Sequence, residues 1–166
     1  YVETDIPTET NWYGRTKALG EINNSKDLTL RTSIIGPELK SDGTGLFHWF
    51  MTQTGVVQGY TNHFWNGITT LELAKQIDKI IDTDLSGLYH LTPKMPTTKG
   101  DLLTMIRDIW EIKDITVEFV QMKNNQNKVL VNNRKKDYDP GIPSYPDQLS
   151  ELKEFDNPFK HFIKDA

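Results

Sequence analysis

The sequence predicts an α/β fold, and three observations indicate it. Helix-type and strand-type patterns alternate along the 166 residues. The segment 69–82 repeats apolar residues at the helical period, whereas 28–35 and 115–122 largely alternate apolar and polar residues as strands do. Because such an alternation is typical of helices packed on a sheet, and a chain of this length can bury a core, we expect one α/β unit.

Each element has its own signal. Thr10 or Asn11 can cap a helix that starts near Trp12 and ends in the Asn-Asn-Ser of 23–25. The helix at 69–82 has a threonine cap and the clearest apolar stripe, formed by Leu71, Leu73 or Ala74, Ile77, Ile80 and Ile81. Other helices are expected at 46–53, from about Lys99 and at 145–155, strands at 28–35, 56–58, 87–91 and 115–122, and loops at 38–45 and 123–128.

The composition excludes several classes of function. A net charge of -4, with no basic run longer than 134–136, leaves no electrostatic footprint for nucleic acid. The absence of cysteine excludes disulfides and thiolate catalysis, and no H-E-x-x-H or comparable spacing predicts a transition-metal site. No apolar run approaches the roughly 20 residues of a membrane span. We therefore predict a cytoplasmic protein that binds neither nucleic acid, membrane nor metal.

The segment NWYGRTKALGE, residues 11–21, places Tyr13 four residues before Lys17 in the predicted first helix. Residues i and i+4 share one helix face about 5–6 Å apart, so the two side chains can act on the same small volume. An ammonium beside a phenol favours the phenolate, and a tyrosine so placed can give a proton to a carbonyl oxygen as hydride reaches the carbon. The three donors of Lys17 can also hold ribose hydroxyls of a nucleotide.

The same spacing has a structural explanation. Lys17 and Glu21 can form an ordinary surface pair at i and i+4, while Tyr13 packs at the edge of a core. From the spacing alone, both interpretations stay open.

The residues around this pair resemble a known family. The segment ETDIPTETNWYGRTKALGE is similar to the active-site segment of extended short-chain dehydrogenases/reductases, in which an acidic-Pro loop precedes Asn, Tyr-Gly, a Lys four residues after the Tyr, and a Glu. Three later segments, LRTSIIGPE, FWNGITTLELAKQI and SGLYHLTP, follow in the order of that family, and most like its dTDP-4-dehydrorhamnose reductase branch. The resemblance covers residues 1 to about 110 in consistent order.

The resemblance implies the C-terminal portion of a Rossmann-type extended reductase, lacking the N-terminal dinucleotide-binding strands. Residues 1–36 would carry the catalytic helix and the strand after it, and 37–166 mainly the substrate-binding lobe. Because the chain opens at Tyr1 in a polar loop, we expect an inactive fragment whose glycine fingerprint lies upstream. The segment GTGLFH, residues 43–48, follows polar residues rather than a strand and does not supply that fingerprint.

The resemblance also implies a reaction. The parent enzyme would use NADPH or NADH to reduce the C4 ketone of a nucleotide-linked 4-keto-6-deoxy sugar in cell-surface polysaccharide synthesis. Tyr13 would be the catalytic acid and Lys17 its partner and ribose clamp, so both would contact the cofactor. A homodimer is among the expected assemblies.

Candidate binding residues follow the first predicted strand. Ligands of open α/β sheets bind beyond the carboxyl ends of strands, so Thr32, Ser33 and Ile34 are placed to meet the nicotinamide, and Ser33 also the sugar. The alternative is that Thr32 and Ser33 only end a strand. Ile34 departs from the family, which has an aromatic residue there, and the path to Gly36 is one residue shorter.

A second group of candidates lies in the segment that resembles the substrate-closing loop. His63, Trp65 and Asn66 are candidate sugar ligands, because an indole can stack on a sugar and a carboxamide can bond a hydroxyl. A buried tryptophan and a turn asparagine before Gly67 explain the same residues structurally.

Three rival functions remain. The nearest is a nucleotide-sugar epimerase or dehydratase of the same superfamily, with the same Tyr-Lys pair. The second is a non-catalytic regulatory protein on this fold, as in the β subunit of methionine adenosyltransferase. The third is an unrelated α/β module in which the pair occurs by chance.

Overall fold

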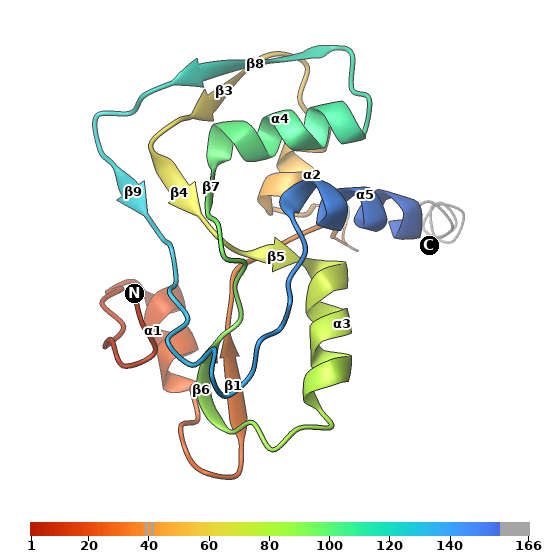
Figure 1. The fold of residues 1–166 in the computed structure, drawn as a ribbon. Coiled ribbons are helices and arrows are strands. Elements are labelled where there is room, and N and C mark those ends of the chain that lie inside the picture. The colour runs from red at the N-terminus through yellow and green to blue at the C-terminus, as the bar shows by residue number, and fades with distance from the viewer. Residues whose placement is uncertain (39, 41, 157–166) are drawn as a thin grey trace.

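The structure is a computed structural model that describes residues 1–38, 40 and 42–156. Helices and strands alternate along it, so the predicted α/β class is confirmed (Figure 1). In chain order the elements are α1 (Trp12–Leu19), β1 (Leu28–Arg31), β2 (Ile34–Ile35), α2 (Leu46–Met51), β3 (Gly55–Tyr60), β4 (His63–Trp65), β5 (Ile68–Thr69), α3 (Thr70–Ile80), β6 (Gly87–His90), β7 (Thr97–Thr98), α4 (Lys99–Ile109), β8 (Ile115–Val120), β9 (Gln126–Asn127) and α5 (Tyr145–Asp156).

In the described part of the chain the strands form four small sheets. Three are parallel pairs, β1 with β6, β2 with β5 and β3 with β8, while β4 lies between antiparallel β7 and parallel β9. The prediction of one continuous strand over 28–35 is wrong, because the chain leaves β6 after Arg31 and pairs with β5 from Ile34. Gly67 permits this change of partner, since a Cβ there would lie 2.2 Å from the carbonyl oxygen of Ser33.

Four short strands have no counterpart among the sequence predictions: β4, β5, β7 and β9. Each contains only two or three residues, too few for a period of two to become visible. The strand β9 falls inside 123–128, which the sequence predicts as a loop, so that prediction is wrong at Gln126 and Asn127.

Two hydrophobic clusters lie in different parts of the molecule. The first joins α2, α4 and α5 to β3 and β8, and includes Phe50, Leu102 and Leu149. The second lies where α3 meets β1 and β6, around Tyr89 and Leu91, both fully buried. Figure 1 shows the first group of elements at the top and the second at the bottom.

Helix α3 begins after its predicted Thr69 cap, whose side chain accepts a hydrogen bond from a backbone N–H of the first turn. Its apolar stripe is only partly inside: Ile80 is buried, whereas Ile77 is 45% and Ile81 76% exposed. Glu72 and Gln76 are buried instead.

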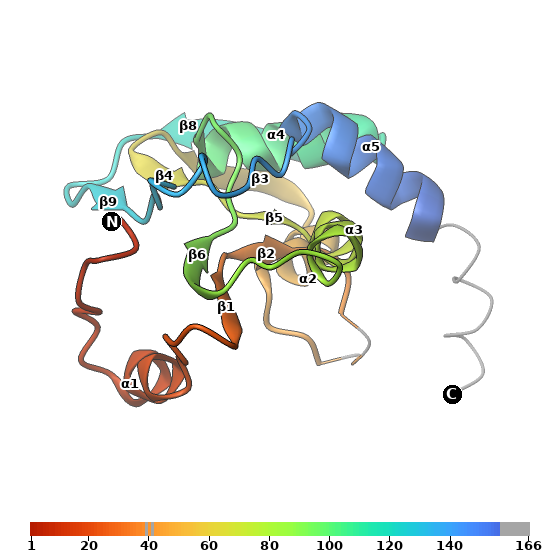
Figure 2. The ribbon, with the colours of Figure 1, turned by 60° about the horizontal axis from the view of Figure 1, so that its bottom comes forward.

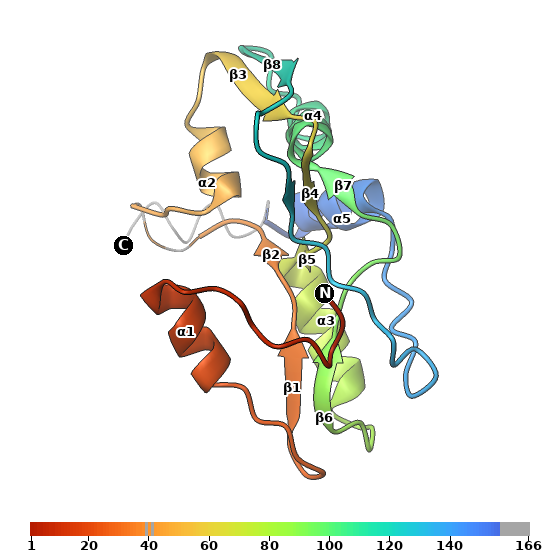
Figure 3. The same cartoon turned by 90° about the vertical axis from the view of Figure 1, so that its left-hand side faces the viewer.

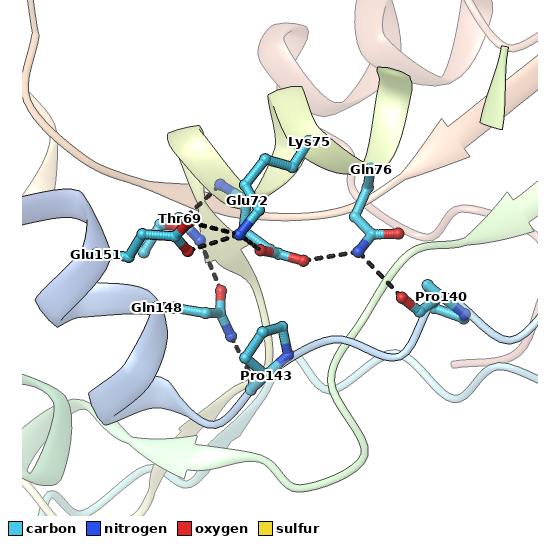
Figure 4. Close-up of polar contacts among 8 residues, drawn as sticks. All are labelled: Thr69, Glu72, Lys75, Gln76, Pro140, Pro143, Gln148 and Glu151. Atoms are coloured by element: carbon cyan, nitrogen blue, oxygen red, sulfur yellow. Dashed lines mark hydrogen bonds and ion pairs between the residues drawn. The ribbon is translucent and has the colours of Figure 1, made fainter. Parts of the chain in front are cut away.

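Polar side chains join α3 to α5 and to the segment that precedes α5, around Pro140 and Pro143, as Figure 4 shows. Gln76 Nε2 donates to Glu72 Oε1 at 2.6 Å and to the Pro140 carbonyl at 3.0 Å. Gln148 of α5 accepts from the Thr69 N–H at 3.1 Å. Since a buried polar group is costly without a partner, these contacts fix how α3 and α5 sit together.

Helix α1 begins where the sequence predicts it, but the predicted end at 23–25 is wrong: the helix stops at Leu19 with Gly20 as its C-cap. It buries no residue. Its Asn11 cap accepts from the Gly14 N–H at 2.8 Å, while Trp12 is 78% and Leu19 86% exposed. Figures 2 and 3 show α1 set apart from the sheets, joined to them by the chain on either side. No helix in the described residues is both long and apolar enough to cross a bilayer.

Candidate functional site

A cavity of about 530 Å³ lies beside α1. Lys17 of α1 lines it, together with Glu21, Arg31 and four residues from β9 and the chain after it, Gln126, Asn127, Lys128 and Leu130. The N-terminal segment also contributes, running from beside β9 to α1 (Figure 2). The cavity therefore brings together parts of the chain that are more than a hundred residues apart in sequence.

The pair Tyr13–Lys17 lies on α1 with the predicted spacing of one turn. Both side chains are exposed, Tyr13 to 76%. In the described part of the chain neither phenol nor ammonium makes a side-chain hydrogen bond or ion pair, and Tyr13 does not line the cavity. The structure thus places Lys17 at the cavity and Tyr13 one turn earlier on the helix, with both polar ends available to a ligand.

The N-terminal segment is held against residues 129–133. The ammonium of Tyr1 donates to the Val129 carbonyl at 3.0 Å, and the Val131 N–H donates to the Tyr1 carbonyl at 2.7 Å. The buried Glu3 carboxylate accepts from the backbone N–H of Asn133 at 3.1 Å. These contacts hold the N-terminal segment, of which Tyr1 and residues 5–9 line the cavity.

Arg31 is one of the charged residues that line the cavity. Its Nε and one terminal nitrogen donate to the two carboxylate oxygens of Glu21 at 2.6 and 2.7 Å. This hydrogen-bonded pairing raises the pKa of the Arg31 guanidinium above its ordinary value. Arg31 and Glu21 therefore neutralise each other at the cavity wall, while the Lys17 ammonium has no side-chain partner among the described residues.

Thr32, Ser33 and Ile34 lie at the carboxyl end of β1, but they do not line the cavity. The Ser33 carbonyl accepts from the Ile68 N–H at 2.8 Å, and the Thr32 hydroxyl donates to the same carbonyl at 3.2 Å. Ile34 is 54% exposed. Their cofactor and sugar contacts stay predictions.

His63, Trp65 and Asn66 are not brought together with Lys17. His63 is buried with its ring 4.8 Å from that of Tyr60, and Trp65 stacks on Tyr145 at 5.8 Å. None of the three lines the cavity.

The carboxamide of Asn66 is hydrogen-bonded to the backbone of Leu130. It donates to the Leu130 carbonyl at 2.7 Å and accepts from the Leu130 N–H at 2.9 Å. Asn66 thereby holds the segment that lines the cavity, and its direct contact with a sugar stays a prediction.

The cavity also contains residues that the sequence interpretation missed, Gln126, Asn127, Lys128 and Leu130. The only signal for the first three was the run of amides and lysines in KNNQNK, residues 123–128, which is equally typical of any solvent-exposed loop. A second cavity of about 650 Å³ lies between residues 92–97 and 139–146, and none of the predicted site residues lines it. Within the described residues there is no cluster of three or more potential metal ligands.

Solved structures share this fold. The dTDP-4-dehydrorhamnose reductase of Bacillus anthracis, in complex with NADP, aligns with a TM-score of 0.74 and 18% identity over 93% of this chain and 59% of that chain. The Clostridium acetobutylicum reductase aligns with a TM-score of 0.70 and 19% identity over the same shares. The dTDP-glucose 4,6-dehydratase of Bacillus anthracis, in complex with NAD, gives 0.57 and 15% over 82% of this chain and 46% of that chain.

No protein family and no curated protein matches the sequence. The structural alignments confirm the predicted resemblance at the level of the fold. This chain has part of the α/β fold seen in these extended short-chain enzymes. It spans about 59% of the length of the two reductases.

Proposed function

We propose that this chain is the part of a nicotinamide-dependent short-chain reductase that carries the Tyr-Lys pair and most of the sugar-binding lobe. The observation that carries the proposal is the location of Lys17, which lines a cavity on a helix where Tyr13 precedes it by one turn. The fold shared with two dTDP-4-dehydrorhamnose reductases supports it. Residues 1–36 would form the catalytic helix and its following strand, and 37–166 mainly the substrate lobe.

The free polar groups of α1 fit a nicotinamide nucleotide. The ammonium of Lys17 offers three donors, which suit the vicinal hydroxyls of a ribose. The Bacillus anthracis reductase is itself a complex with NADP, which supports NADPH or NADH as the cofactor here. When bound, the nicotinamide would supply hydride, and Thr32, Ser33 and Ile34 at the end of β1 are proposed to contact it.

The chain's own residues would supply the proton that the reduction requires. Tyr13 would donate its phenolic proton to the oxygen of the C4 ketone of a nucleotide-linked 4-keto-6-deoxy sugar as negative charge develops there. Lys17 would stabilise the resulting phenolate through its positive charge, one helical turn away. Ser33, His63, Trp65 and Asn66 are the proposed sugar contacts. We also propose a cytoplasmic location and a homodimer for the parent enzyme.

The alignment with a dTDP-glucose dehydratase favours one alternative, an epimerase or dehydratase of the same superfamily. Such an enzyme returns the hydride to its product and consumes no reduced nicotinamide overall. Net oxidation of NADPH or NADH by the full-length protein, followed at 340 nm with a 4-keto-6-deoxy nucleotide sugar, separates the reductase from this alternative.

Tyr13→Phe tests the catalytic role directly. In the full-length protein it should lower kcat by about 100-fold or more, the usual effect of losing a general acid, with little change in cofactor affinity. Trp12→Phe is the matched control, because Trp12 is equally exposed on the same helix at 78%. Unchanged turnover in Tyr13→Phe would remove the phenol from the reaction.

A further inference from the structure

Arg31 connects the catalytic helix to the body of the molecule. It is the last residue of β1, and only 16% of its side chain is exposed. Glu21, which follows the Gly20 cap of α1, accepts two hydrogen bonds from Arg31. Because a bidentate guanidinium–carboxylate pair fixes orientation as well as distance, this contact determines where the C-terminal end of α1 lies against β1.

His90 continues the connection on the other side of Arg31. It is fully buried and stands opposite Arg31 in the β1–β6 register. Its Nδ1 lies 3.0 Å from the Val131 carbonyl, which can only accept, so Nδ1 carries the proton. The unprotonated Nε2 therefore faces a terminal nitrogen of the Arg31 guanidinium at 3.4 Å. At this length the contact is a weak hydrogen bond, which helps to orient the guanidinium. Burial lowers the pKa of His90, which keeps the ring neutral beside a permanent cation.

The far end of the connection is the segment after β9. Gln126, Asn127, Lys128 and Leu130 line the cavity, and Val131 follows Leu130 immediately. Glu3 holds the same region, since it accepts from the His90 N–H at 3.3 Å and from the Asn133 N–H at 3.1 Å. Helix α1 and the segment 126–131, whose residues up to Leu130 line the cavity, are thus tied to the same pair of side chains in β1 and β6.

We propose that Arg31 and His90 are positioning residues: the series Glu21, Arg31, His90, Val131 holds α1 and the segment 126–131 at a fixed separation and so sets the width of the cavity that Lys17 lines. This structural role, the separation of α1 from 126–131, can be tested whether or not the chain catalyses a reaction. Only its effect on turnover rests on the proposed function, in which Tyr13 and Lys17 must meet a substrate held by the opposite wall.

A distance measurement across the cavity tests this. The chain contains no cysteine, so Leu19→Cys and Lys128→Cys, at exposed positions on the two walls, place spin labels at unique sites. With Arg31 present, pulsed electron resonance should give one narrow distance distribution. Arg31→Lys should broaden it, because a single ammonium cannot make both bonds to Glu21 while facing His90. An unchanged narrow distribution would overturn the proposal.

Two further variants serve as a control for the Arg→Lys change and as an independent test of the positioning role. Arg107→Lys is the matched control, since Arg107 pairs with its neighbour Asp108 on α4, and it should leave the distribution unchanged. His90→Asn keeps a donor near Nδ1 but loses the acceptor toward Arg31, so it should broaden the distribution in the same direction by a smaller amount. If Arg31→Lys does not fold, His90→Asn decides: a distribution identical to that of the parent chain would reject the positioning role.

Kinetics give a second reading in the full-length enzyme. Arg31→Lys should lower kcat about tenfold or more with KM changed less than about twofold, the pattern of displaced rather than missing groups. A loss confined to KM would contradict the proposal. If the full-length protein with Arg31 intact reduces no ketone, the proposed function fails, and the spin-label distances still decide the positioning role.

Discussion

At the scale of single residues, His90 links the stability of the chain to pH. The groups that face its ring are the Arg31 guanidinium, the Glu3 carboxylate, the Val131 carbonyl and, farther away, the ammonium of Tyr1. Burial, the largest influence, lowers the pKa of His90 in the folded state. The unfolded chain, with a histidine pKa of about 6.5, then binds more protons than the folded chain as pH falls below that value, and unfolding becomes easier.

We therefore expect the free energy of unfolding to fall as pH is lowered below about 6.5 toward the depressed folded pKa, with a slope of at most ~1.4 kcal/mol per pH unit from this residue. Urea titrations at pH 7.5 and 5.5 measure the fall. His90→Asn should show a smaller fall between the two pH values, although its stability at pH 7.5 is lower. His48→Gln, at a partly exposed helical position, should keep the full dependence. Equal falls in His90→Asn and the parent chain would contradict the assignment.

Two pairs of residues, Tyr13 with Lys17 and Arg31 with His90, differ in whether the sequence could predict their proximity. The one-turn spacing of Tyr13 and Lys17 on α1 could be predicted because a helix places residues four apart on one face, whereas their role in a site stays a prediction. Arg31 and His90 are 59 positions apart and meet only because β1 and β6 pair in one particular register. The sequence contains no local signal for that register, so the contact between Arg31 and His90 could not be predicted from it.

At the scale of elements, Lys75 of α3 forms two ion pairs of unequal burial, one within its own helix and one with α5 (Figure 4). Lys75 lies 3.3 Å from one oxygen of Glu72, whose side chain is 1% exposed, and 2.6 Å from Glu151, whose side chain is 45% exposed. The buried carboxylate depends on the ammonium, because water cannot replace it. The exposed carboxylate can be solvated when its partner is lost.

Lys75→Met should therefore destabilise the chain by about 3 kcal/mol, the size expected when a buried charge loses its partner. Glu151→Gln should cost no more than about 1 kcal/mol, because it removes only the exposed half of the contact. Urea unfolding followed by far-UV circular dichroism gives both values. Equal losses in the two variants would show that Glu72 does not need Lys75.

Helices and strands differed in how far the sequence could predict them. Caps such as Thr69 and Thr98 mark where α3 and α4 begin, since the cap is a contact between neighbours in sequence. The strand predicted over 28–35 is broken because Gly67 lets the chain change partners there. Such a change depends on a residue more than thirty positions away, which no pattern within the strand reports.

At the scale of the whole molecule, the two hydrophobic clusters are joined through the parallel β2–β5 pair and the polar contacts of α3 with α5. Helix α1 belongs to neither cluster. The α/β class was predictable, because alternation along the chain is a property of the sequence itself. The division into separate sheets and clusters was not, because it depends on which distant strands pair.

This division predicts an order of local stability for the 166-residue chain. Helix α1 has eight residues, none buried, and a helix of that length is marginal without packing. Hydrogen exchange read by NMR should therefore find its amides the least protected of the five described helices, and those of α4, with Leu102 and Ile106 buried, among the most protected. The bidentate contact of Arg31 with Glu21 restrains only the end of α1, so the first turn should exchange fastest. Protection of α1 equal to that of α4 would mean that the chain covers this helix in solution, most simply by self-association through Trp12 and Leu19, and a concentration series would reveal it.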